Sequence, residues 1–202
     1  MPLPNNFDLL PYEQAILRDT EFLLTKQLVL QKAVLLMGQV AAQLQETGYP
    51  ATFLFPDGCD FRKGKISRGE HYEGLPYVVL DLPRLFNRQH IFVFRTMLLW
   101  GNSFVFTLHV SGQYAQQYAP SIVQNWQQLQ QMGLHVNTTN NQWQHLLNRN
   151  YYQAIEQTAP DAFLKTAKNN GFFKLCCAMP LAQWSNLPDA AAKTCRILLK
   201  AL

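Results

Sequence analysis

The chain has 202 residues, of which 48% are hydrophobic and 15% are charged, and its net charge is +4. This length is enough for one sizeable hydrophobic core, so we expect a single domain over residues 1–202. The mild positive charge permits an anionic ligand or a nucleic acid but requires neither, and the basic residues form no polybasic tail.

Three features predict a cytoplasmic protein. The four cysteines include no CxxC pair, which indicates reduced and mostly buried thiols. The N-terminus has no basic segment followed by a long apolar run, so it does not resemble a signal peptide. No stretch approaches the roughly 18 apolar residues that a membrane span needs, and we therefore expect no membrane partner.

Residues 20–47 have the pattern of a long helix. Asp19 or Thr20 is a suitable N-cap, and Gly48 followed by Pro50 ends the pattern. Apolar residues cover most of the helix and leave only a narrow polar stripe. A helix of this kind is either a central core helix or a dimer interface. We favour the core interpretation and keep a homodimer as the alternative.

The centre of the predicted sheet is a β-hairpin over residues 91–110. Two β-rich, aromatic-rich runs flank a Gly-Asn pair, and both residues tolerate the positive φ of a two-residue primed turn. With such a turn, Leu99 opposes Phe104 and one face of the hairpin is almost entirely apolar. Arg95 would then be a charge on that apolar face, where it needs an anionic partner or ligand.

The other predicted elements complete an α+β fold. Further strands are expected at 65–67, 75–82, 134–137 and 172–179, and further helices near 120–133, 143–155, after residue 160 and over 189–202. Neighbouring strands joined by short connections predict an antiparallel sheet of about four to five strands. The long N-terminal helix and the C-terminal helices are expected to pack on it.

The densest polar segment is residues 62–74, which contains four basic residues and three glycines. It does not fit the phosphate-binding pattern GxxxxGK[ST], because five residues separate Gly58 from Gly64 and Ile66 stands where Ser or Thr is required. We interpret the segment as a solvated edge hairpin. A contact with an anion or a nucleic acid is the alternative.

A resemblance rests on the same part of the chain. The segments Lys65–Glu70, Tyr72–Asp81 and Pro83–Arg84, together with the hairpin, are similar to an uncharacterised family of small bacterial proteins of the Bacteroidetes type. The resemblance covers a minority of the chain and implies a bacterial cytoplasmic protein. It transfers no catalytic residue.

The candidate ligand-binding residues are the basic side chains Lys65, Arg68, Arg84 and Arg95. Arginines bind carboxylates and phosphates through paired hydrogen bonds, so arginines that converge in the fold would form an anion site. Asp81 ends an apolar strand and offers a structural alternative, an ion pair with Arg84 or Arg95 that holds two strands in register.

Signals for catalysis are weak. The chain has no GxSxG motif and no metal-ligand spacing of histidines, so we predict no metal site and no cofactor. An enzyme with an unfamiliar site would use His71, Glu73, Asp81 and His109, provided that the strands bring these side chains together.

The sequence thus predicts a non-enzymatic binding or interaction protein for an anionic small molecule or protein partner. The alternatives are an enzyme with the His/carboxylate site and a structural homodimer. No strong motif supports a nucleic-acid partner.

Overall fold

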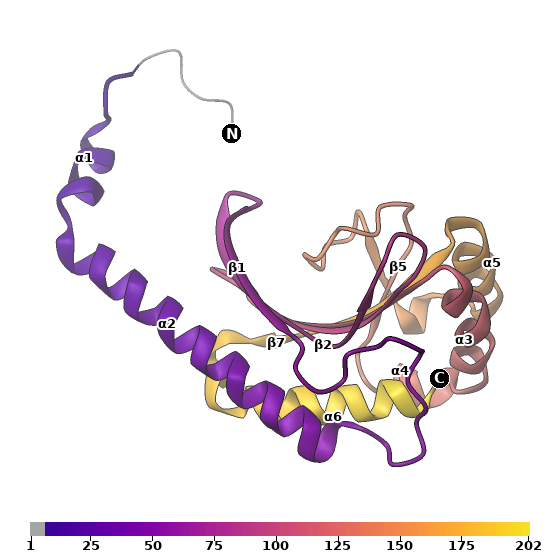
Figure 1. The fold of residues 1–202 in the computed structure, drawn as a ribbon. Helices are drawn as coiled ribbons and strands as arrows, with labels where there is room; N and C mark the ends of the chain where they lie inside the picture. The colour runs from indigo at the N-terminus through magenta and orange to yellow at the C-terminus, as the bar shows by residue number, and fades with distance from the viewer. Residues whose placement is uncertain (1–6) are drawn as a thin grey trace.

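The structure, a computed structural model, describes residues 7–202 as helices packed against one antiparallel sheet (Figure 1). The helical elements are α1 (Pro11–Arg18), α2 (Thr20–Gln43), η1 (Leu44–Gly48), α3 (Gln113–Gln124), α4 (Trp126–Gln130), η2 (Ile155–Gln157), α5 (Pro160–Asn170), η3 (Leu181–Asn186) and α6 (Leu187–Lys200). The strands are β1 (Lys65–Tyr72), β2 (Leu75–Phe86), β3 (Ile91–Leu99), β4 (Ser103–Ser111), β5 (His135–Asn137), β6 (Tyr152–Ala154) and β7 (Phe172–Pro180).

The α+β class and the antiparallel sheet are confirmed, but the predicted number of strands is wrong. The sheet has seven strands in the order β1-β2-β3-β4-β7-β5-β6, rather than four to five. Two of the strands, β5 and β6, have only three residues each. The strand expected at 134–137 is present as β5, whereas β6 was not predicted, because three residues carry too little alternation to give a clear sequence pattern.

The predicted register of the central hairpin is also wrong. The β3–β4 loop has three residues instead of two, so that Leu99 pairs with Ser103 and Leu98 pairs with Phe104. A shift of one residue moves every side chain of one strand to the other face of the sheet. As a result, Arg95 does not lie on the apolar face but pairs with Thr107 on the opposite one.

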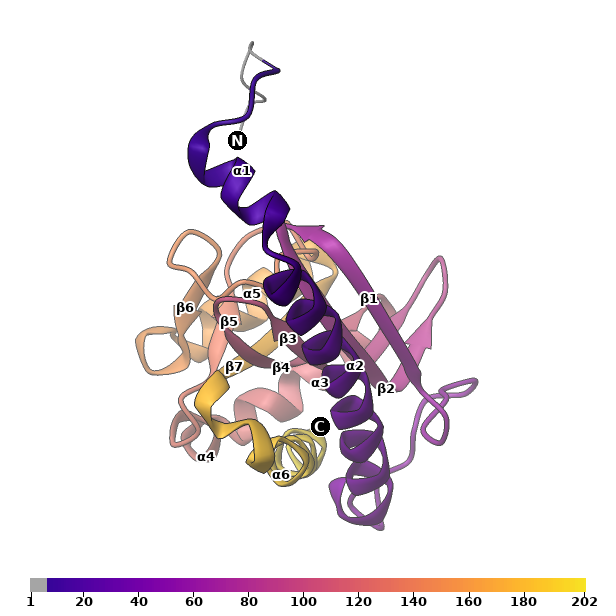
Figure 2. The ribbon, with the colours of Figure 1, turned by 90° about the vertical axis from the view of Figure 1, so that its left-hand side faces the viewer.

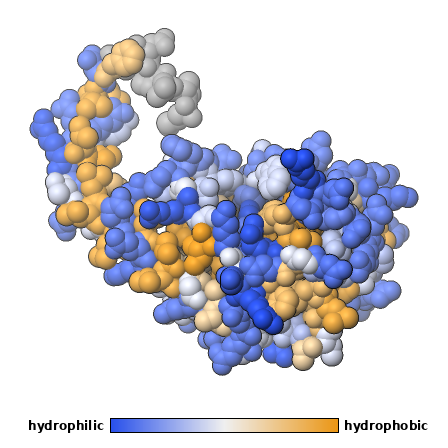
Figure 3. All heavy atoms as spheres, viewed as in Figure 1, coloured by the Kyte–Doolittle hydropathy of each residue, from blue (hydrophilic) through white to orange (hydrophobic). Residues whose placement is uncertain are grey.

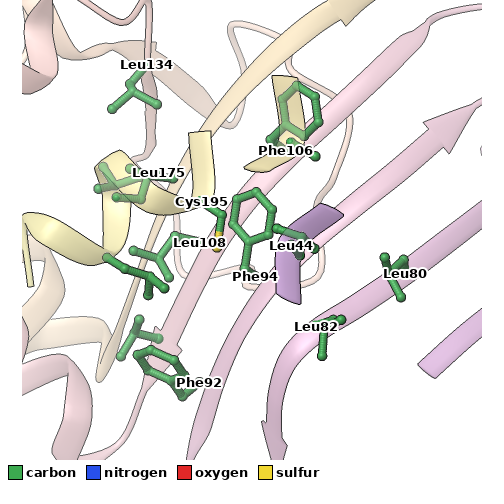
Figure 4. Packing of buried hydrophobic residues seen from close by; sticks show 14 of the residues in the cluster. Leu44, Leu80, Leu82, Phe92, Phe94, Phe106, Leu108, Leu134, Leu175 and Cys195 are labelled. Carbon is green, nitrogen blue, oxygen red and sulfur yellow. The ribbon is translucent and has the colours of Figure 1, made fainter. Parts of the chain in front are cut away.

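The main hydrophobic core lies between the sheet and the layer of α2 and α6, which cover one face of the curved sheet (Figures 1 and 2). In Figure 4, Phe94 of β3 lies next to Leu44 of η1 and Cys195 of α6, and all three side chains are almost completely buried. The predicted long helix is therefore confirmed as a core element over its C-terminal half. None of the helices in residues 7–202 combines the length and the apolar composition needed to cross a membrane.

The other face of the sheet carries no layer of long helices. The loop of residues 138–151, which joins β5 to β6, covers part of this open face (Figure 1). Beneath it lies a small second core that includes Met97, Val105, Tyr152 and Cys176. The uncovered part of the open face, over β1, β2 and β3, contains the candidate site.

We expect Thr96→Val to raise the free energy of unfolding by about 1 kcal/mol. Thr96 lies in the main core opposite Leu80 and Phe106, and its buried Oγ1 has no hydrogen-bond partner in residues 7–202. Valine keeps the volume and removes the unsatisfied hydroxyl. Thr96→Ser, which keeps the hydroxyl and removes the methyl group, should lower the same quantity by about 1 kcal/mol. Urea unfolding measures both, and a less stable Thr96→Val variant would contradict this assignment.

Candidate functional site

A pocket of about 450 Å³ lies on the open face over the first three strands of the sheet. Its wall combines cations with aromatic rings. The lining side chains are the basic Lys65, Arg84 and Arg95, the acidic Asp81, the aromatic Tyr72, Tyr77, Phe86 and Trp143, and Ser67, Val79, Met97 and His145. With three cations and one carboxylate, the pocket has a net charge of about +2 at neutral pH.

Sheet register explains why these polar groups meet. Lys65 pairs with Asp81, Asp81 with Arg95, and Arg95 with Thr107, so that the four side chains form one row across β1 to β4. Arg84 joins them because the β2–β3 register shifts between Asp81 and Arg84. In a regular strand two residues three positions apart point to opposite faces, and the irregularity places both on the open face.

Arg95 and Asp81 form a two-pronged ion pair at the floor of the pocket. The Nε of Arg95 donates to Oδ1 of Asp81 at 2.7 Å, and Nη2 donates to Oδ2 at 2.9 Å. The third nitrogen, Nη1, lies 3.0 Å from Nε2 of His145. Arginine can only donate, so Nε2 of His145 is the acceptor in this contact. Of the two ion pairs expected for Asp81, the structure contains the one with Arg95.

Hydrogen bonds from several strands hold the 138–151 loop on the open face. From β7, Lys174 donates through Nζ to the carbonyl oxygens of Gln142, at 3.2 Å, and of Gln144. From β1, the hydroxyl oxygen of Tyr72 accepts from the backbone N–H of His145 at 2.7 Å. The third contact is the one between Arg95 and His145. Together they hold Trp143, which is 54% exposed, at the wall of the pocket.

Asparagine side chains explain the conformation of this loop. The Oδ1 atom of Asn137 accepts from the N–H of Thr139 at 2.9 Å, and that of Asn141 accepts from the N–H of Trp143 at 3.0 Å. Such local turns compete with helical hydrogen bonds. The helix predicted over residues 143–155 is therefore wrong.

Burial sets the protonation state of the ionisable groups under the loop. It lowers the pKa of His145 to about 2 and that of His109 to about 3, and the positive charges of Lys174 and Arg95 act in the same direction. Burial also lowers the pKa of Lys174 to about 8. Both histidines are therefore neutral at physiological pH and act as hydrogen-bonding groups. Neither has the pKa near 7 that suits a general acid or base.

Arg84 and Lys65 differ from Arg95 because they form no salt bridge within residues 7–202. The Nε of Arg84 is buried and has no hydrogen-bond partner there. Its guanidinium carbon lies 5.6 Å from the centre of the Phe86 ring, a distance at which a cation is attracted to an aromatic face. These two residues are the cations of the pocket without a salt bridge in residues 7–202, and Arg84 pairs through its backbone with Asp60, whose carboxylate its charge also stabilises.

The structure brings together three of the four predicted ligand-binding residues, Lys65, Arg84 and Arg95. Arg68 lies elsewhere. It is exposed and pairs with Val78, whose side chain belongs to the main core on the helix-covered face. Glu70, two residues further along β1 on that face, pairs with Lys26 of α2 at 2.8 Å.

The residues of the enzyme hypothesis do not form one cluster in the described part of the chain. His71 and Glu73 are exposed at the tip of the β1–β2 hairpin. Asp81 bonds Arg95, whereas His109 bonds the side chain of Gln142 at 3.1 Å. No group of three His, Cys, Asp or Glu side chains in residues 7–202 is arranged to hold a metal ion.

Sequence reasoning did not select Tyr72, Trp143, His145 or Lys174 for the site. Their role depends on the 138–151 loop, which lies over the sheet, and no sequence pattern predicts where that loop lies. The one available signal was Lys174 itself, a charge within the apolar run of residues 172–179. A lysine in such a run needs polar partners, which the loop carbonyls supply.

Comparisons with models of protein families, with curated proteins and with solved structures find no match to this chain. The resemblance of residues 65–84 to a family of small bacterial proteins stays a prediction. The site must therefore be interpreted from its own geometry.

Asp81→Asn should lower the free energy of unfolding by about 3 kcal/mol, because it leaves the Arg95 guanidinium without its counter-charge. Both side chains are largely buried, with exposed fractions of 15% for Arg95 and 11% for Asp81. Glu70→Gln is the matched control, since it breaks the more exposed Lys26–Glu70 pair and should cost less than about 1 kcal/mol. Equal effects of the two substitutions in urea unfolding would contradict the structural role of Asp81.

The protein should lose stability between pH 7 and pH 5. The pKa of His109 and of His145 is lower in the folded protein than the ordinary value of 6.5, so the unfolded chain binds more protons below that pH. The stability that the two neutral histidines contribute is therefore present above about pH 6.5 and decreases by up to about 1.4 kcal/mol per pH unit for each group. Lys174 is protonated in both states over this range.

Thermal or urea unfolding across this pH range measures the effect. His109→Asn and His145→Asn should each remove part of the pH dependence. If both variants retain the full dependence of the wild type, groups other than these histidines cause it.

Proposed function

We propose that the protein is a non-enzymatic binding protein for a small anionic ligand that carries a flat aromatic or apolar body. The single observation that carries this proposal is the pair of cations without a salt bridge in residues 7–202, Lys65 and Arg84, in a pocket that four aromatic side chains also line. A carboxylate or phosphate group would satisfy the buried Nε of Arg84.

The three cations have different roles in this proposal. Arg95 directs all three of its nitrogens at Asp81 and His145, so it is a positioning residue that fixes the pocket floor. Arg84 is the principal anion-binding residue, and Phe86 supports its guanidinium. Lys65 adds a second, flexible positive charge.

The aromatic side chains would hold the body of the ligand. Tyr72, Tyr77, Phe86 and Trp143 all contribute to the wall of the pocket. Large aromatic side chains contribute the most free energy when their surface is removed from water. Trp143 is exposed and is held at the pocket, so it is suited to stack on a flat ring.

The size of the pocket favours a small molecule over a macromolecule. About 450 Å³ falls within the range of roughly 300–1,000 Å³ that is usual for small-molecule sites. Aryl phosphates and aromatic carboxylates fit both the volume and the charge.

The protonation states support binding rather than catalysis. His145, the histidine of the pocket, has a pKa of about 2 and stays neutral. Burial raises the pKa of all four cysteines, and none of them lines the pocket. A bacterial cytoplasmic setting remains a prediction of the sequence.

Phenyl phosphate is a suitable probe, and isothermal titration calorimetry should detect its binding to the wild type. Arg84→Ala should weaken binding at least about tenfold, since a hydrogen bond to a charged group contributes about 1.5–3 kcal/mol. Lys65→Met should weaken it to a smaller extent. Phenol keeps only the aromatic ring and inorganic phosphate keeps only the anionic group, so each should bind less tightly than phenyl phosphate.

Arg68→Ala is the matched control, because it removes one arginine from the opposite face of the sheet and should leave the affinity unchanged. No binding to the wild type at millimolar concentration, or equal losses in the Arg84 and Arg68 variants, would exclude the proposed site.

A further inference from the structure

The N-terminal part of the structure carries an apolar surface that is separate from the pocket. We call residues 7–28 the arm, and Figures 1 and 2 show that it projects beyond the body of the protein. Ten large hydrophobic side chains of the arm are at least 44% exposed. Figure 3 shows the apolar residues along it. They are Phe7, Leu9, Leu10, Tyr12, Ile16, Leu17, Phe22, Leu23, Leu24 and Leu28.

Apart from the Lys26–Glu70 ion pair, the helices of the arm have little support from the rest of the described chain. α1 has eight residues and contains no buried residue, and the first buried residue of α2 is Leu30. Isolated helices shorter than roughly 12–15 residues are marginal in water, and packing of an apolar face supplies most of the stability of helices in proteins. A second surface is therefore needed to cover the arm.

An apolar stripe continues from the arm along the outside of α2. Leu24, Leu28 and Leu35 are 66%, 50% and 70% exposed. At 3.6 residues per turn, these three positions lie within about 40° of one another around the helix. We call them the outer stripe. The buried residues Ala33 and Val40 lie on the opposite side of α2.

The spacing of the outer stripe is that of a helix–helix seam. Intervals of four and seven residues match the heptad positions that pack one helix against another, with Gln31 at the intervening position. α2 is thus apolar on two opposite sides. The sheet and α6 cover one side, and nothing in residues 7–202 covers the other.

The exposed apolar area of the arm is large. Its ten large side chains present on the order of 1,000 Å² in total, spread over more than one face, since Phe22 and Leu23 lie about 160° and 100° from Leu24 around α2. The largest apolar patch of a typical monomer is about 300–600 Å². A standard interface takes about 800 Å² from each partner.

Charge indicates which partner fits this surface. The arm contains four acidic and two basic residues, a net charge of −2, and the whole chain has +4, so the remainder carries +6. An acidic arm is unsuited to an anionic lipid surface, which recruits helices with basic polar faces. It is complementary to the basic body of a second copy of this chain.

We propose that two copies of the chain form a homodimer in which the α2 helices pack antiparallel along their outer stripes. Leu24 of each subunit then lies opposite the partner's Leu35, and each acidic arm lies on the basic body of the other subunit. A parallel arrangement would place two acidic arms side by side, away from both bodies. The contact is self-complementary, as a two-fold interface requires.

Light scattering coupled to size-exclusion chromatography tests the proposal on the full chain. The wild type should have twice the 23.2 kDa mass of one chain. The double variant Leu24→Glu/Leu28→Glu should have the mass of one chain, with reduced helical circular dichroism from the arm and the cooperative unfolding of the body retained. Leu54→Glu is the matched control, because Leu54 is 86% exposed outside the arm and the stripe, and this variant should remain a dimer.

Cysteine cross-linking tests the orientation. Under oxidising conditions, Leu24→Cys/Leu35→Cys should form a covalent dimer that Leu24→Cys alone does not form. Cross-linking by the single variant would overturn the antiparallel arrangement. A wild type with the mass of one chain, a dimer that survives Leu24→Glu/Leu28→Glu, or a monomer that sediments with phosphatidylcholine vesicles would overturn the dimer itself.

Discussion

The ion pair between Arg95 and Asp81 is the interaction on which the open face of the sheet depends. It joins neighbouring strands and holds the guanidinium in one orientation, with two nitrogens on the carboxylate. The remaining nitrogen of Arg95 is then directed at His145 and fixes the 138–151 loop. If either charge of the pair were removed, the other would be left largely buried without compensation. The register of these strands, the position of the loop and the shape of the pocket therefore all depend on this one ion pair.

Lys174 adds a second buried cation of a different kind. No acidic group compensates it within the described residues, and its ammonium group instead faces the carbonyl oxygens of Gln142 and Gln144. Carbonyl dipoles stabilise a cation less than a carboxylate does, in agreement with a pKa lowered to about 8. Two buried cations thus fix one loop, and the loop places Trp143 at a pocket where Lys65 and Arg84 form no salt bridge within residues 7–202. Arg95 and Lys174 thus find their hydrogen-bond partners within the chain.

The sequence predicted the α+β class and the antiparallel sheet, because both depend on strong local signals. The long helix and the paired strands follow from apolar periodicity. Arg95 was selected as a charge in the central hairpin, although on a register that is wrong, and Arg84 for its closeness to Asp81 in the sequence. The hairpin register could not be predicted securely, since a Gly-Asn pair suits loops of two and of three residues. The charge of Arg95 on a face assigned to the core was the available sign of a shifted register.

Other features could not be predicted because they depend on contacts between distant segments. Strand β6, with three residues, is defined by its pairing with β5 rather than by a sequence pattern. In the loop between them, leucine and tryptophan spacing resembles a helix, but asparagine side chains such as Asn141 form local turns instead. The exclusion of Arg68 from the site follows only from strand alternation, which places it on the opposite face from Lys65.

Nuclear magnetic resonance of the arginine side chains tests the central claim most directly, because it observes the Arg84 guanidinium, which we propose binds the anion. In a titration of ¹⁵N-labelled wild type with phenyl phosphate, the Nε–H signal of Arg84 and the indole N–H signal of Trp143 should shift together and saturate at the same concentration. The Nε–H signal of Arg68 should not move. Shifts confined to exposed basic residues, with Arg84 and Trp143 unaffected, would contradict the assignment of the pocket as an anion-binding site.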